Sequence, residues 1–111
     1  MEPGSVMHIV GVQCRTGLEE KFQQWYNEVH VPMLLKFPGL KAITQYQITK
    51  PDAKYPSFLA TYEFDNVEAF IKYEQSDELA ASRKQADETW VEGDQEVKWR
   101  VQYKAVRTWQ R

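Results

Sequence analysis

The sequence has a single cysteine, Cys14, and therefore no partner for an internal disulfide. One thiol without a CxxC or Cys/His grouping is no metal-binding motif, and the HxH and HExxH spacings are absent. No window approaches the roughly 18 consecutive apolar residues that a membrane span requires. The first residues, MEPGSV, show neither region of a secretory signal. We therefore expect a soluble, cytoplasmic protein with no metal site and no membrane partner.

Two further absences exclude other classes of function. Glycine-rich phosphate loops are missing, so no nucleotide cofactor is expected, and the absence of GxSxG disfavours a serine nucleophile. The 14 basic residues are interleaved with 16 acidic ones, and the net charge of −2 offers no positive field to a phosphate backbone. We expect no cofactor and no nucleic-acid partner.

Aromatic residues, in contrast, are abundant. Four Trp, six Tyr and five Phe make up 14% of the 111 residues, which is more than a small core needs to exclude water. Because buried Tyr and Trp side chains need hydrogen-bond partners, such a set is typical of an amphipathic cavity. The length predicts one domain over residues 7–111, after a flexible lead of residues 1–6.

The first third of the sequence predicts a strand and then a helix. Residues 7–14 (MHIVGVQC) are short, β-branched and free of proline, which favours a strand. Thr16 and Glu19 fit a capping box at the start of the helix. Pro32 cannot donate a backbone hydrogen bond, so we expect the helix to kink or restart near Val31. The apolar stripe of this helix consists of Leu18, Phe22, Trp25 and Val29.

The middle of the sequence predicts a hairpin. Residues 40–49 and 57–64 both alternate between apolar and polar side chains, and the loop 50–56 between them carries two prolines. On the third strand, the alternation gathers Phe58, Ala60, Tyr62 and Phe64 on one face. On the second strand, it predicts one face made of Leu40, Ala42, Tyr46 and Ile48.

A second helical region and a last strand complete the pattern. Asp65 with Glu68 fits a helix cap, and Ser76 restarts the helix. Residues 96–109 alternate and predict a fourth strand of fourteen residues, about 46 Å long at roughly 3.3 Å per residue. Three basic residues share one face of this strand, and we interpret them as solvated or as partners of charges across a dimer: Lys98, Arg100 and Lys104.

The order β-α-β-β-α-β predicts an α+β protein of ferredoxin-like topology, with a four-stranded antiparallel sheet and both helices on one face. The other face needs a cover, because it is expected to carry Ile43, Leu59 and Val106. The predicted fourth strand is so long that it would extend beyond the sheet of its own protomer. Both features predict a homodimer in which two sheets pack together.

The segment FQQWYNEVHVPMLLKFPGLKAITQY, residues 22–46, resembles the W-Y-x-x-x-H-x-P … P-G … Y signature of EthD-like proteins in the dimeric α+β barrel superfamily. The resemblance implies two protomers that join their sheets, with a small-molecule pocket between the helices and the sheet of each. Superfamily members include cofactor-independent monooxygenases, polyketide cyclases, isomerases and haem-degrading enzymes. In this sequence the implied pocket would involve Trp25, Tyr26, His30, Tyr46, Tyr62 and Trp90.

His30 is the main candidate for a catalytic residue. It continues the row of Phe22 and Tyr26 along one side of the helix, where an imidazole can reach a cavity and act as a general base. The alternative is a structural histidine bonded to free carbonyls at the end of the helix. His8 shares its strand face with Val10 and either lines the same pocket or lies in solvent at the strand end.

These residues support three hypotheses. The first is a cofactor-independent monooxygenase, isomerase or cyclase that acts on a small aromatic or enolisable compound, with His30 as general base and Tyr46 or Trp25 orienting the substrate. The second is a non-catalytic ligand-binding dimer of the EthD-like type, and the third is a purely structural dimer. A cavity of roughly 300 to 1,000 Å³ beside His30 would favour the first two.

Overall fold

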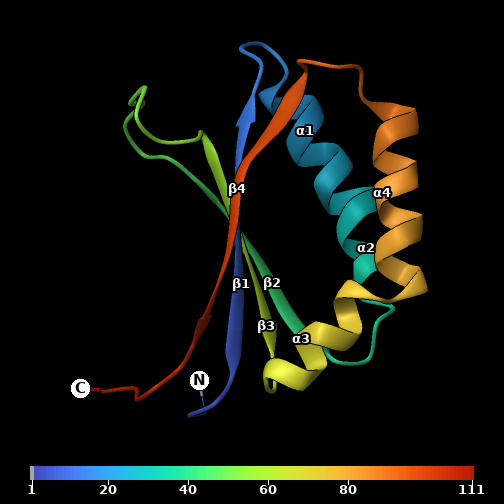
Figure 1. Ribbon diagram of the computed structural model, residues 1–111. Coiled ribbons are helices and arrows are strands. Elements are labelled where there is room, and N and C mark those ends of the chain that lie inside the picture. Colours follow the sequence, from blue (N-terminus) through green and yellow to red (C-terminus); the bar gives the residue numbers. More distant parts are fainter. Residues whose placement is uncertain (1) are drawn as a thin grey trace.

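A four-stranded antiparallel sheet with every helix on one face confirms the ferredoxin-like α+β prediction (Figure 1). The computed structural model describes residues 2–111. The strands are β1 (Val6–Cys14), β2 (Leu40–Gln47), β3 (Phe58–Phe64) and β4 (Gln95–Lys104). The helices are α1 (Glu19–Trp25), the π-helix η1 (Tyr26–His30), α2 (Val31–Leu34), α3 (Val67–Glu74) and α4 (Asp77–Thr89).

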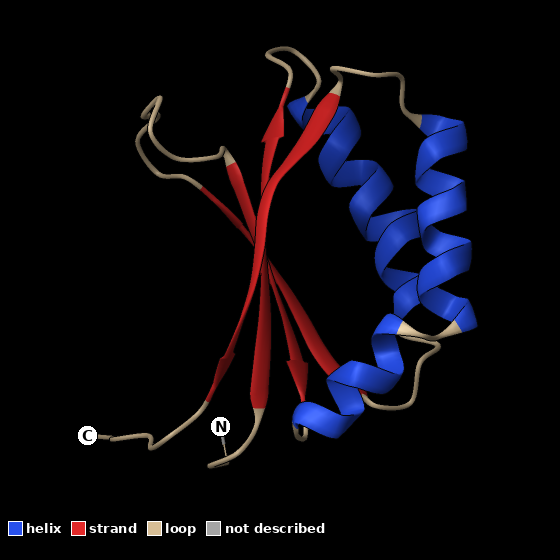
Figure 2. Ribbon diagram, viewed as in Figure 1, coloured by secondary structure: helices blue, strands red, loops and turns tan. Residues whose placement is uncertain are grey.

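The core lies between the helices and the two central strands of a sheet whose order is β2-β3-β1-β4. On β3 the predicted face is confirmed, because all four of its residues are buried. The register places Val10 of β1 opposite Ala60 and His8 opposite Tyr62. Figure 2 shows that the opposite face of the sheet, which we call the outer face, has no helix over it.

The first helix does not begin with the predicted capping box. Leu18 occupies the N-cap position and makes no side-chain cap bond. The carboxylate of Glu19 instead accepts a hydrogen bond from the backbone N–H of Gly17, at 2.6 Å. Gly17 has a φ of 96°, a left-handed conformation that favours glycine. This turn between Thr16 and the helix moves the Thr16 side chain out of capping position.

A new α-helix starts at Val31, where Pro32 predicts a kink or restart, but a π-helical turn joins it to α1 without a gap. The helix changes from α to π geometry at Tyr26, and the backbone N–H of Val31 donates to the carbonyl of Tyr26, five residues earlier. A proline ring clashes with the carbonyl four residues before it, here that of Glu28, which lies inside the wide turn. The widened turn therefore accommodates Pro32 near the start of α2. Such π-turns are frequent at functional sites.

The caps of the second helical region are predicted in part. Ser76 caps α4 as expected, because its hydroxyl oxygen accepts a hydrogen bond from the N–H of Leu79 at 3.1 Å. The cap of α3 is Asn66 rather than Asp65, since the Asn66 side chain accepts from Ala69 at 2.8 Å. Asp65 forms an exposed ion pair with Lys41 at 3.1 Å.

A bulge in β2 overturns the predicted faces of that strand. The register against β3 shifts between Leu40 and Ala42. Beyond the shift, Ile43 lies opposite Tyr62 on the helical side, and Tyr46 lies opposite Leu59 on the outer face. One extra residue exchanges the two faces of everything that follows it. The expected positions of Ile43 and Tyr46 are therefore wrong.

The fourth strand is shorter than predicted and also carries a register shift. It ends at Lys104, although Gly4 and Ser5 still exchange backbone hydrogen bonds with Ala105. The shift falls opposite Gly11 and Val12 of β1. It places Val97 and Arg100 on the helical side and Trp99 on the outer face. Val106 lies beyond the strand and is exposed.

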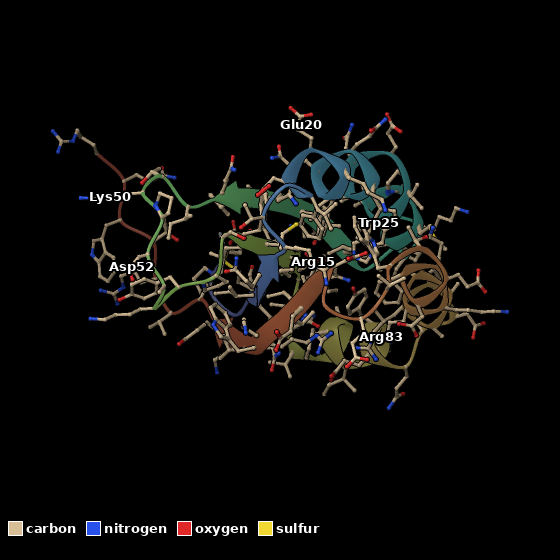
Figure 3. The ribbon with its side chains drawn as sticks, turned by 90° about the horizontal axis from the view of Figure 1, so that it is seen from above. Arg15, Glu20, Trp25, Lys50, Asp52 and Arg83 are labelled. Atoms are coloured by element: carbon tan, nitrogen blue, oxygen red, sulfur yellow. The ribbon has the colours of Figure 1, made fainter. Side chains whose placement is uncertain are left out.

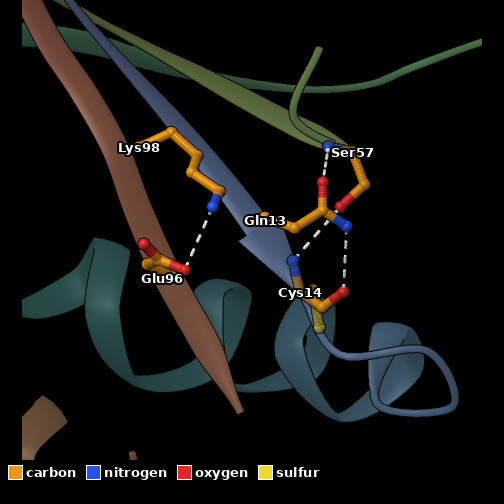
Figure 4. Close-up of polar contacts among 5 residues, drawn as sticks. All are labelled: Gln13, Cys14, Ser57, Glu96 and Lys98. Atoms are coloured by element: carbon orange, nitrogen blue, oxygen red, sulfur yellow. Dashed lines mark hydrogen bonds and ion pairs between the residues drawn. The ribbon is translucent and has the colours of Figure 1, made fainter. Parts of the chain in front are cut away.

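Polar side chains tie the end of β1 to β3 (Figure 4). The N–H of Ser57 donates to the amide oxygen of Gln13 at 3.1 Å, and the N–H of Cys14 donates to the Ser57 hydroxyl at 3.2 Å. Nearby, Lys98 forms an exposed ion pair with Glu96 at 3.1 Å. Between residues 2 and 111, no helix is long and apolar enough to cross a bilayer.

Candidate functional site

A cavity of about 390 Å³ lies between the helices and the sheet. Its volume falls within the range of roughly 300 to 1,000 Å³ that is usual for ligand pockets. The walls come from β1, β3 and β4 on one side and from the helices on the other. Five residues that the sequence analysis selected line this one cavity: His8, Trp25, Tyr26, His30 and Tyr62.

Two of the selected residues do not line the cavity. Tyr46 is 51% exposed on the outer face, where the β2 bulge has turned it away from the helices. Trp90 is buried behind the wall and packs edge-on against Trp25, with ring centroids 5.5 Å apart. The structure therefore brings together five of the seven selected residues.

His30 lies in the wall of the cavity with an unused hydrogen-bonding atom. Its Nδ1 is buried and has no partner among residues 2–111. The ring stacks on Trp25 at a centroid distance of 4.6 Å and lies 4.8 Å from the ring of Tyr26. The chain continues directly into α2, so His30 does not cap the end of a helix.

Burial lowers the pKa of His30 from 6.5 to about 4, because the apolar surroundings disfavour the charged ring. At neutral pH the imidazole is therefore uncharged and one ring nitrogen holds a free lone pair. A neutral imidazole in a cavity wall can accept a proton from a bound molecule.

A hydrogen bond from α1 to α4 fixes the orientation of Trp25. The indole N–H donates to the side-chain oxygen of Gln85 at 2.8 Å, and the Gln85 amide donates to the hydroxyl of Thr89 at 2.7 Å. Since the indole N–H is occupied, Trp25 can offer a ligand only the surface of its ring. Figure 3 shows Trp25 and Arg83 on the helical side of the sheet.

The hydroxyls of Tyr26 and Tyr62 are hydrogen bonded to each other inside the protein. Burial raises the pKa of both phenols, so both stay protonated at neutral pH. The pair holds two hydroxyl hydrogens, and only one of them can lie in the bond between the two oxygens. The other remains to donate to an oxygen of a bound molecule.

His8 is also neutral and buried, at 7% exposed. Burial, and next the positive charges of Arg100 and Arg83, lower its pKa from 6.5 to about 4. Its Nδ1 lies 3.0 Å from the side-chain nitrogen of Gln102. Because an amide nitrogen can only donate, the neutral ring carries its own proton on Nε2.

Arg83 and Arg100 line the same cavity and were missed from the sequence. Arg83 follows Leu79 by four residues and precedes Ala86 by three, so helical spacing alone places it beside the apolar stripe of α4. For Arg100, no feature of the sequence indicated a place in the cavity wall. Its side was set by the register shift in β4, which the alternation of the sequence does not reveal.

The N-terminal four fifths of the chain match a known family. The family is described as a domain of unknown function, DUF4286, and it matches residues 5–92. The chain belongs to the DUF4286 family. The match includes β1, all the helices and β3, so all the cavity walls except the part from β4 lie within the DUF4286 region. No curated protein matches the sequence significantly.

Solved structures share the fold of this DUF4286 chain at low sequence identity. HapK from Hahella chejuensis aligns with a TM-score of 0.73 and 11% identity, over 96% of this chain and 97% of its own. An EthD family protein from Bacillus halodurans gives 0.64 and 17%, over 92% and 98%. SnoaB, a cofactor-independent oxygenase from Streptomyces nogalater, gives 0.64 and 13%, over 95% and 96%. The expected likeness to EthD-like barrel proteins is confirmed at the level of fold.

Within the described part of this DUF4286 chain, no group of three or more His, Cys, Asp or Glu side chains could hold a metal ion. His8 and His30 both line the cavity, but no carboxylate or thiol joins them in such a group. The absence of a metal and of a cofactor stays a prediction.

Both imidazoles should titrate far below a normal histidine. In a proton NMR titration of the folded protein, we expect the two ring C–H signals to shift with midpoints near pH 4. In denaturant both should shift near 6.5. The unfolded chain then binds more protons between these values, so stability should fall as the pH drops from 6.5 to 4. A midpoint near 6.5 for either folded-state signal would contradict the buried, neutral state.

Proposed function

We propose that the cavity binds a small aromatic or enolisable compound and that His30 removes a proton from it. The observation that carries this proposal is the position of His30 in the wall of a ligand-sized cavity, with a buried Nδ1 that has no partner among residues 2–111. Leaving a buried polar atom without a partner costs about 1 to 3 kcal/mol. A ligand that supplies a hydrogen bond to this atom would recover that free energy.

The residues around His30 can stabilise both products of such a proton transfer. The imidazolium that forms is stacked on the Trp25 ring, where a cation is attracted by the π-system. The enolate or phenolate oxygen needs a hydrogen-bond donor, and the hydroxyl pair of Tyr26 and Tyr62 has one hydrogen to give. The ring of Trp25 offers a flat surface for an aromatic substrate.

Removal of a proton is the step that an oxygenase, an isomerase and a cyclase can share. An enolate can react with dioxygen, take its proton back at another carbon or attack a carbonyl in the same molecule. The fold likeness to SnoaB, itself a cofactor-independent oxygenase, supports the first of these for the present chain. The alternative is a protein that binds such a compound without turnover.

Hydrogen–deuterium exchange tests the proton transfer without knowledge of the later steps. We expect the wild-type protein to bind β-tetralone, an enolisable bicyclic ketone, and to accelerate the exchange of its C1 protons in deuterated buffer, followed by proton NMR. Binding with exchange at the buffer rate would favour the non-catalytic alternative. Absence of binding at millimolar concentration would contradict the proposal as a whole.

We also propose that the protein is a homodimer formed through the outer face of the sheet. This face carries Leu59 beside Gly11, and Trp99 and Tyr103 on it are 41% and 62% exposed. No helix covers these side chains, and an exposed apolar face of this kind marks an interaction surface. Figure 1 shows the loop after β2 and the C-terminal residues both leaning away from the helices, past this face, where a second copy would meet them.

A further inference from the structure

Two arginines from different elements face the same cavity. Arg83 belongs to α4 and Arg100 to β4, at the open edge of the sheet. Neither guanidinium has an ion-pair or hydrogen-bond partner within residues 2–111. Four other basic side chains do form ion pairs, among them Arg15 with Asp94 at 3.3 Å. Two unpaired guanidinium groups at one cavity end make a local excess of positive charge.

His8 adds a neutral donor to this end of the cavity. It lines the same cavity as the two arginines, and both arginines act electrostatically on its ring. Since Gln102 occupies Nδ1, the proton of the ring lies on Nε2. That N–H has no acceptor among residues 2–111.

Two carboxylates also line the cavity, and they could cancel the positive charge. Glu74 ends α3 and Asp87 lies one turn beyond Arg83 on α4, and both are exposed to solvent, as Arg83 and Arg100 are. Neither carboxylate comes within ion-pair distance of Arg83 or Arg100. The charges that lower the pKa of His8, after its burial, are those of Arg100 and Arg83.

We propose that Arg83, Arg100 and the Nε2 of His8 form the binding site for a carboxylate on the substrate, so that the compound bound in the cavity is an aromatic acid. This inference rests on the proposed function, because it assumes that the cavity takes an aromatic compound. Guanidinium groups bind carboxylates with two parallel, charge-assisted hydrogen bonds. The acid group binds at the α4 and β4 end, and the ring extends toward Trp25 and His30.

Two ligands of nearly the same shape, one with a charged head group and one with a neutral head group, test the site. We expect β-naphthoate to bind at least about tenfold more tightly than the neutral β-naphthamide, measured by isothermal titration calorimetry at low salt. Arg100→Gln should weaken naphthoate binding about tenfold and leave naphthamide binding unchanged, and Arg83→Gln should do the same. Lys84→Gln is the matched control, since it removes the same charge from the neighbouring position of α4 but does not touch the cavity.

The outcomes separate this inference from the proposed function. Equal affinity for the two ligands, or an equal loss in Lys84→Gln and Arg100→Gln, overturns the carboxylate site and leaves the proton transfer by His30 standing. Preference for naphthoate without any acceleration of β-tetralone exchange supports the carboxylate site and contradicts the catalysis. If neither naphthalene compound binds at millimolar concentration, the carboxylate site fails, and the proposed function fails with it only if β-tetralone does not bind either.

Discussion

Replacing His30 by glutamine should lower the protein-catalysed exchange of β-tetralone by about 10²- to 10⁴-fold, the usual contribution of a general base. Glutamine fills a similar volume and can still donate a hydrogen bond, but its amide has no basic nitrogen. The affinity for the ketone should therefore change much less than the exchange rate. Both quantities can be measured on one sample by NMR.

Tyr46→Phe is the control for this variant. Tyr46 is an aromatic residue that lies on the outer face of the sheet, so its hydroxyl should be irrelevant to exchange. The melting temperature of His30→Gln should stay within a few degrees of the wild type. Unchanged exchange in a folded His30→Gln variant would exclude His30 as the base. A stability loss above roughly 3 kcal/mol with no effect on ligand binding would make it a structural residue.

Replacing Leu59 by aspartate should dissociate the dimer and destabilise the protomers. Leu59 lies on the outer face of the central strand β3, opposite Gly11 on one side and Tyr46 on the other. Packing two such faces together would bury an unpaired carboxylate from each copy, which costs several kcal/mol. Sedimentation equilibrium of the wild type should give twice the chain mass of 13.1 kDa, and the variant should give the single chain or unfolded material.

The matched control for Leu59→Asp is Leu35→Asp. Leu35 is 47% exposed and follows α2 on the helical side, so the same change of side chain should leave the dimer intact. A wild-type protein that sediments as a single 13.1 kDa species at micromolar concentration would contradict the dimer directly.

The strands that were predicted well are those without register shifts against each other. β1 and β3 pair without interruption, so strict alternation correctly grouped His8 with Val10 on one face of β1 and Tyr62 with Phe58 on one face of β3. β2 and β4 each have a shift, and the alternation fails beyond it, which is why Tyr46 was assigned to the wrong face and Arg100 was not recognised as a residue of the cavity wall. A bulge depends on how a strand meets its partner, and neither site is marked by a glycine in the bulging strand.

The helical part of the site was easier to predict. The spacing of Phe22, Tyr26 and His30 along one side of the helix, together with the family resemblance, selected residues that the structure places in contact. The π-turn was not predicted, because Pro32 indicated only a kink or restart near Val31, and its ring can be accommodated by widening the preceding turn. Trp90 was selected for its ring alone, and burial behind Trp25 could not be read from its spacing.

The central claim is that the cavity beside His30 is the ligand site. Intermolecular nuclear Overhauser effects between bound β-tetralone and the assigned aromatic side chains test it most directly. We predict contacts from the ketone ring protons to the rings of Trp25 and His30, and none to Tyr46 or Trp99 on the outer face. Contacts to Tyr46 or Trp99 in place of Trp25 and His30 would contradict the account.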